Sequence, residues 1–117
     1  MTMPMAGPIE NSGSIVAFCQ TDDAPISRRS LFFDEIHTGD RVLLCFATDD
    51  DAKPPYSLRI RSPSGALILE KMVRELPTGL PQSEPPVEFV VSATGDYVIE
   101  IRESRGKNWG RAKLRVT

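Results

Sequence analysis

The sequence predicts an all-β protein, an antiparallel two-sheet β-sandwich of about eight strands with jelly-roll or Greek-key connections. Apolar and polar residues alternate with period two in several short segments, and turns rich in glycine or proline separate these segments. No long stretch keeps the spacing of an amphipathic helix. A chain of 117 residues is the usual size of one domain with a single core.

Period-two alternation places the expected strands. In Tyr56-Ser57-Leu58-Arg59-Ile60-Arg61 every second residue is apolar, which is typical of a strand with one buried and one solvent-facing side. The pattern recurs around Ile99, and Phe89 shares an apolar face with its neighbours. We therefore expect Leu58, Phe89 and Ile99 in the core. Strands are expected at residues 14–19, 29–35, 41–47, 56–62, 66–73, 87–93, 96–103 and 111–116.

Turn chemistry separates these strands. Thr38-Gly39-Asp40, Ser62-Pro63-Ser64-Gly65 and Ala93-Thr94-Gly95-Asp96 each place a glycine where a tight reversal needs a positive φ. Residues 76–86 hold four prolines, so we expect a long crossover loop between the two sheets there. Residues 1–12 are expected to form a flexible tail, and residues 13–117 the sandwich domain.

The composition limits the classes of partner. The formal net charge is −2 and the pI about 5.4, so no overall attraction to nucleic acid or to an anionic membrane is expected. The apolar runs fall far short of the roughly 18 residues of a membrane-spanning helix. Residues 1–8 do not resemble a secretory signal. We expect a cytoplasmic protein, or an extracellular or periplasmic one if the chain belongs to a longer exported protein.

The two cysteines, Cys19 and Cys45, are too few for a disulfide framework and lack the spacing of a metal site. Half-buried thiols that pack as small apolar side chains are expected. The sequence leaves open whether the two thiols pair with each other.

The order of the segments carries further information. It begins with Ser12-Gly13-Ser14-Ile15 and continues through Thr38-Gly39-Asp40-Arg41-Val42, Tyr56-Ser57-Leu58-Arg59-Ile60, Thr94-Gly95-Asp96-Tyr97-Val98-Ile99 and Gly110-Arg111-Ala112-Lys113-Leu114. Over residues 12–117 this order resembles the bacterial pre-peptidase C-terminal domain, a jelly-roll-like module appended to exported enzymes. The resemblance implies a non-catalytic accessory domain.

Catalytic chemistry is hard to assemble from these residues. The single histidine, His37, lies in an expected turn, and no nucleophile motif accompanies it. Acid–base catalysis by His37 needs an orienting partner within hydrogen-bond reach. We therefore expect a protein that is not an enzyme and that has no organic cofactor.

Calcium is the metal for which the sequence offers ligands. Asp49, Asp50 and Asp51 place three carboxylates in one loop, and hard cations prefer clustered oxygens. Adjacent aspartates point in different directions, so a site there needs donors from elsewhere, such as Asp22, Asp23 or Glu10. The alternative is a solvated acidic turn.

A basic surface is a further candidate. Basic residues alternate outward on strands that are expected to share or neighbour a sheet face: Arg59, Arg61, Arg102, Lys113 and Arg115, with Arg105, Lys107 and Arg111 adjoining them. Such a patch can hold a phosphate or an acidic partner through charge-assisted hydrogen bonds. The alternative is a set of cross-strand ion pairs with Glu100 and Glu103, which stabilise only slightly.

Trp109 is the strongest single candidate. It lies in Arg105-Gly106-Lys107-Asn108-Trp109-Gly110, a polar hairpin with little apolar company. Exposed aromatic residues in loops mark contact surfaces for sugars, peptides or partner chains. The alternative is that the indole folds back and caps the end of the sandwich.

The sequence as a whole favours a non-catalytic binding or accessory module, which contacts a protein or polysaccharide through end loops or an open sheet face. The residues expected to contact this ligand are Trp109, Asn108, Lys107, Arg59, Arg61 and Arg102. The alternative function is a structural protein that self-associates into a homo-oligomer through its sheet faces or edges.

Overall fold

The computed structural model describes residues 9–21, 36–48, 51–80 and 82–117. In these residues the chain forms eight strands: β1 (Ile9–Gly13), β2 (Val16–Thr21), β3 (Arg41–Ala47), β4 (Tyr56–Arg61), β5 (Leu67–Val73), β6 (Val87–Val90), β7 (Gly95–Glu103) and β8 (Trp109–Val116). No helix that is long and apolar enough to cross a membrane occurs in the described ranges.

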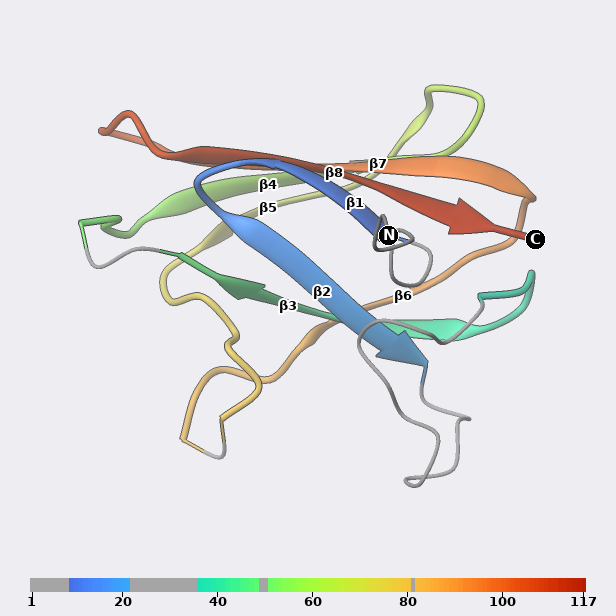
Figure 1. Cartoon of the computed structure of the whole chain (residues 1–117), viewed down its shortest axis with the longest axis horizontal. Coiled ribbons are helices and arrows are strands. Elements are labelled where there is room, and N and C mark those ends of the chain that lie inside the picture. Colours follow the sequence, from blue (N-terminus) through green and yellow to red (C-terminus); the bar gives the residue numbers. More distant parts are fainter. Residues whose placement is uncertain (1–8, 22–35, 49–50, 81) are drawn as a thin grey trace, which may run out of the picture.

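The strands form two antiparallel sheets that lie as layers (Figure 1). One sheet has five strands in the order β1-β8-β7-β4-β5, and the other has three in the order β2-β3-β6. The chain passes between the sheets after β1, β3, β5 and β6. The proline-rich loop between β5 and β6 is one of these passages, as expected, because proline cannot donate to a strand ladder. The all-β sandwich predicted from the sequence is confirmed.

The core lies between the inner faces of the two sheets. Leu58, Phe89 and Ile99 are exposed by only 0%, 9% and 1%, as the alternation predicts. Tyr97 is buried too, and its hydroxyl accepts hydrogen bonds from the backbone N–H groups of Ser92 and Ala93 at 3.0 and 3.1 Å. Because these N–H groups bind Tyr97, β6 ends at Val90 and does not continue to residue 93 as expected.

The amino-terminal strand differs from the sequence-based expectation. Residues 9–12, expected in a tail, belong to β1, where Ile9 is buried opposite Leu114 of β8. The next strand begins at Val16 and not at residue 14, because the chain turns from one sheet to the other there. The carbonyl of Trp109 accepts the N–H groups of Ser14 and Ile15 at this corner. The expected strand at residues 29–35 lies outside the described residues.

The two cysteines do not form a disulfide with each other, and both are buried. Cys19 lies opposite Leu44, whereas Cys45 lies opposite the neighbouring residue Phe18. Successive residues of a strand point to opposite faces, so the two thiols are directed to different sides of the three-stranded sheet. Burial raises the pKa of the Cys45 thiol.

Candidate functional site: the Trp109 groove

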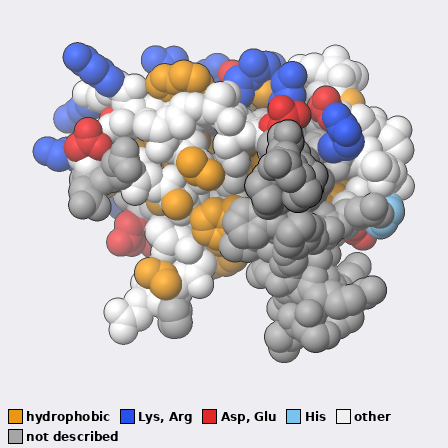
Figure 2. Space-filling view, in the orientation of Figure 1, with side chains coloured by type: hydrophobic (Ala, Val, Ile, Leu, Met, Phe, Trp, Pro, Cys, Tyr) orange, Lys and Arg blue, Asp and Glu red, His pale blue; other side chains and the backbone are white. Residues whose placement is uncertain are grey.

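The outer face of the five-stranded sheet, which points away from the other sheet, is rich in basic side chains. Lys and Arg gather along the upper border of the molecule, above this sheet (Figure 2). Strand register sets them in rows across the sheet. One row runs Trp109, Arg102, Ser57 and Met72, and the next runs Arg111, Glu100, Arg59 and Glu70.

A groove of about 910 Å³ opens on this face, over β8, β7, β4 and the hairpin between β7 and β8, and we call it the Trp109 groove. Its side-chain and backbone lining comes from Ser57, Arg59, Glu100, Ile101, Arg102, Glu103, Ser104, Gly106, Lys107, Asn108, Trp109, Gly110 and Arg111. Five of the residues expected to contact a ligand therefore line one groove: Trp109, Asn108, Lys107, Arg59 and Arg102. Arg61, the sixth expected contact, does not line it. The groove has the volume of a typical ligand site.

Trp109 is half exposed, at 50%, and begins β8. Its backbone is fixed, since its carbonyl accepts the N–H groups of Ser14 and Ile15 at 2.9 and 3.1 Å. One edge of the indole lies close to Gly13, where a Cβ would come within 3.0 Å of the indole Cε3 atom. Gly13 also has a φ of 96°, a value that favours glycine. One edge of the indole ring therefore lies against Gly13, and about half of the Trp109 surface is exposed to solvent.

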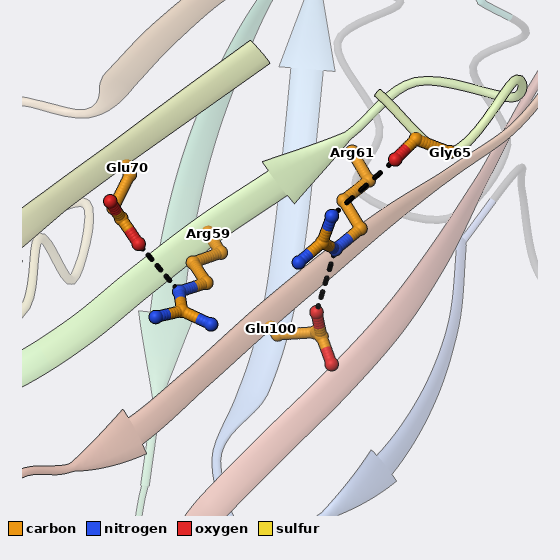
Figure 3. A network of polar contacts seen from close by, with 5 residues as sticks. All are labelled: Arg59, Arg61, Gly65, Glu70 and Glu100. Atoms are coloured by element: carbon orange, nitrogen blue, oxygen red, sulfur yellow. Dashed lines mark hydrogen bonds and ion pairs between the residues drawn. The ribbon is translucent and has the colours of Figure 1, made fainter. Parts of the chain in front are cut away.

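The arginines on the β4 side of the outer face are paired (Figure 3). Arg59 forms an ion pair with Glu70 at 2.6 Å, and Arg61 lies 3.6 Å from Glu100. Arg61 also donates a hydrogen bond to the carbonyl of Gly65 at 3.4 Å. The expected cross-strand ion pairs therefore form here, and they occupy both arginines.

The basic side chains around Trp109 differ from Arg59 and Arg61 in their ion pairing. No ion pair in the described part of the chain involves Arg102, Arg111 or Lys107. Arg102 lies across the sheet between Trp109 and Ser57, neither of which carries a charge. These positive charges therefore remain available to a ligand.

Glu103 stabilises the hairpin that lines the groove. This role differs from the outward ion pair that the sequence predicted for it. It continues the buried side of β7 after Ile101 and is only 7% exposed. Its carboxylate accepts the backbone N–H of Lys53 at 2.7 Å and that of Asn108 at 2.8 Å. These two N–H donors hold the pKa of the Glu103 carboxyl below its ordinary value. Period-two alternation from Ile101 is the sequence signal that could have placed Glu103 on the inner side of β7.

The hairpin between β7 and β8 closes tightly over this carboxylate. A Cβ on Gly106 would lie 2.5 Å from the Glu103 Oε1 atom, so a larger residue there would require the Glu103 carboxylate to shift. Ser14 donates a hydrogen bond to the Asn108 Oδ1 atom at 2.9 Å. The Asn108 side chain, expected to contact a ligand, is therefore also part of the scaffold. Burial, followed by the negative charge of Glu103, raises the pKa of nearby Tyr56.

The expected calcium ligands are only partly described. Asp49, Asp50, Asp22 and Asp23 lie outside the described residues. Asp51 and Glu10 are both exposed, and Glu10 lies opposite Lys113 on β1. No group of three or more His, Cys, Asp or Glu side chains suited to a metal occurs within the described ranges. Calcium binding stays a prediction.

His37 lies far from the Trp109 groove. Its Nδ1 atom is 3.1 Å from the hydroxyl of Thr117, and its backbone N–H donates to the Asp40 carboxylate at 2.9 Å. Thr117 follows the carboxyl end of β8, whereas Trp109 begins that strand, so about 25 Å separates the two places at the rise of an extended chain. His37 therefore cannot act on a ligand in the groove.

Comparisons with known proteins found no match: no family model, no curated protein and no solved structure matches this chain. The resemblance to the pre-peptidase C-terminal domain stays a prediction. The case for a function therefore depends on the groove itself.

Proposed function

We propose that this protein is a non-catalytic binding module that contacts a protein or polysaccharide through the Trp109 groove. The observation that carries the proposal is the half-exposed Trp109 indole, held at the side of a groove whose polar lining includes Arg102, Lys107 and Asn108. Anchors at interfaces are commonly Trp, Tyr or Arg side chains set in a recess.

The scaffold supports binding because it is ordered before a ligand arrives. Strands β8, β7 and β4 each pair with neighbours on both sides. The Glu103 carboxylate fixes the hairpin that carries Lys107 and Asn108. A preformed site avoids the entropy cost of ordering loops on association, so more of the contact free energy appears as affinity.

The proposal is tested with Trp109→Ala. Retention of the protein on glycan or collagen-type matrices should be lost in this variant while its melting temperature stays close to that of the native protein. Leu80→Ala is the matched control, since Leu80 is an exposed apolar residue at 67% that lies outside the groove. Equal retention of both variants on every matrix that holds the native protein would rule the groove out as the binding site.

Self-association is the second candidate, and the edge strand β5 favours it. Among the described strands, β5 pairs only with β4, and its other edge has no partner. Leu67, Ile68 and Met72 on β5 are exposed by 44%, 45% and 59%. Unpaired edges with apolar side chains can pair with a second copy, although Glu70 and Lys71 work against this. A molar mass that rises with protein concentration, and falls back to the monomer in Ile68→Lys, would support this candidate.

A further inference from the structure

The Trp109 groove carries positive charge that the protein does not neutralise. Arg102, Arg111 and Lys107 line it, and none of them has an ion pair in the described part of the chain. The two carboxylates that line it, Glu100 and Glu103, already have partners. A ligand in the groove therefore meets uncompensated cations, although the whole chain has a net charge of −2.

Two of these cations are neighbours of the flat, apolar indole ring of Trp109 on the sheet. Arg102 faces Trp109 directly across the β7–β8 pair, at about 5 Å between Cα atoms. Arg111 follows on the same strand and the same face, about 7 Å along the chain from Trp109. Guanidinium groups bind carboxylate and sulfate through paired hydrogen bonds, and an indole offers a broad apolar surface to another ring. The groove thus suits a ligand that carries rings and anions in close alternation.

An acidic peptide in extended form fits the groove less well. Peptides that lie along a sheet gain affinity from main-chain hydrogen bonds to an unpaired edge. The strands under the groove, β8, β7 and β4, are all interior to their sheet and use their main-chain groups in pairing with neighbours. A ligand in the groove can therefore contact only side chains and the hairpin. Such contacts favour recognition of the ligand's rings and charged groups.

A single-stranded nucleic acid also fits less well. Proteins that bind such strands stack successive bases on several aromatic side chains in a basic channel. The groove offers one aromatic residue, Trp109, and its row continues with Arg102, Ser57 and Met72. Stacking of one ring with charge contacts on either side is better matched to a sugar chain.

We infer that the ligand of the Trp109 groove is an acidic polysaccharide, whose sugar rings carry carboxylate or sulfate groups. This inference rests on the proposed binding function and names the class of its ligand. The indole packs on the apolar face of one sugar ring. Arg102 and Arg111 bind the anionic groups of that ring and its neighbour, and Lys107 adds a third positive charge from the hairpin.

Trp109 is the chain's single tryptophan, so its fluorescence reports occupancy of the groove directly. The probe is a short oligogalacturonate, and its methyl-esterified form is the matched control because it has the same rings without the charge. We expect the acidic form to change the emission and to bind at least about tenfold more tightly than the ester. Added salt should weaken the acidic form selectively, because ions screen its charge contacts.

Two matched variants on β8 distinguish the effect of a charge inside the groove on affinity from the effect of the protein's overall charge. Arg111→Gln should weaken binding of oligogalacturonate about tenfold, the loss expected for one charge-assisted contact. Arg115→Gln removes the same charge from the same strand and face, but Arg115 lies outside the groove and 3.8 Å from Asp96. It should leave the affinity nearly unchanged. Equal losses in the two variants would overturn the inference.

A second measurement needs no ligand. Because Trp109 lies among unpaired cations, iodide should quench its emission more efficiently relative to caesium than it does for free N-acetyltryptophanamide. The difference should shrink in Arg102→Gln and Arg111→Gln, and persist in Arg115→Gln. An iodide-to-caesium quenching ratio in the native protein equal to that of N-acetyltryptophanamide would show that the groove lacks the positive potential on which the inference depends.

The outcomes distinguish the inference from the proposed function. Equal binding of the acid and the ester would overturn the acidic ligand while leaving a polysaccharide-binding module. Tighter binding of poly-L-glutamate or of oligodeoxythymidine would replace the ligand class with an acidic protein or a nucleic acid. If none of these probes changes the emission, the inference fails, and the matrix assay with Trp109→Ala decides the proposed function separately.

Discussion

The two halves of the outer face of the five-stranded sheet carry the same kinds of side chain in different electrostatic states. On the β4–β5 half, Arg59 and Arg61 are each held by a glutamate. On the β7–β8 half, Arg102 and Arg111 have no ion pair in the described part of the chain. The comparison shows that a count of arginines on a face does not predict which of them are held in ion pairs. Register accounts for Arg102, which has no carboxylate opposite it, whereas Arg111 lies opposite Glu100 and is unpaired because the ion pair of Glu100 is with Arg61.

For Arg102 the difference follows from a single step in register. Arg59 stands in a row between Glu100 and Glu70, so a carboxylate flanks it on both sides. Arg102 stands one row away, between Trp109 and Ser57. Residues directly opposite on neighbouring strands are close enough to interact, and diagonal neighbours such as Arg61 and Glu100 are still within reach of long side chains. The position of Arg102 along its strand therefore leaves it without a carboxylate directly opposite on either neighbouring strand.

The largest expected effect comes from removing the support of the β7–β8 half. Glu103→Gln takes the charged acceptor from the N–H groups of Lys53 and Asn108 and turns an amide donor toward one of them. We expect the melting temperature to fall by several degrees and the affinity for the acidic probe to fall by more than about tenfold. Thermal unfolding and the fluorescence titration measure the two effects.

Glu88→Gln is the control for this change, because Glu88 is exposed on β6 in the other sheet. It should alter neither quantity noticeably. If Glu103→Gln bound the probe as well as the native protein, the hairpin would not depend on the buried carboxylate, and the preformed character of this half would be disproved.

The sequence predicted the sheet more completely than the site, for a physical reason. Alternation fixes which side of a strand faces the core, so residues such as Leu58 and Ile99 could be placed from their neighbours alone. Pairing between Arg59 and Glu70 depends on which strands are adjacent and in what register, and local pattern does not encode that. Trp109 was found because a large aromatic residue in a polar hairpin is unusual. Arg61 does not line the groove, and outward alternation alone does not tell paired arginines from unpaired ones.

Acid should weaken the β7–β8 half through protonation of Glu103. The pKa of Glu103 is lowered in the folded protein, so its contribution to stability is complete above the ordinary carboxyl pKa of about 4.3. The contribution is lost as the pH falls from there through the folded-state pKa, where the carboxylate takes up a proton. Melting temperature measured against pH should therefore drop over this range in the native protein. In Glu103→Gln the drop should be smaller, and parallel curves for the two proteins would contradict this assignment.

The smallest effect is expected from a variant that frees an arginine on the β4–β5 half from its ion pair, so that this half resembles the β7–β8 half. Glu70→Gln removes the partner of Arg59, which lines the groove from the β4 side. Glu100 would then be the remaining carboxylate beside both Arg59 and Arg61, so one positive charge would be left uncompensated. We expect the affinity for oligogalacturonate to rise about two- to threefold. Stability should hardly change, because both members of the pair are half exposed and such pairs contribute at most about 1 kcal/mol.

The control for Glu70→Gln is Glu84→Gln, which removes the same charge from an exposed position in the loop between β5 and β6. If Glu84→Gln raised the affinity equally, the gain would reflect the net charge of the whole protein acting over a distance. The gain in affinity should instead be confined to Glu70→Gln, and it should be lost again when Arg59→Gln is added. This result would show that the Arg59–Glu70 ion pair is what keeps the charge of the β4–β5 half from a ligand. The double variant is informative because Glu70 can act on the groove through Arg59 only if the freed guanidinium is the group that meets the ligand.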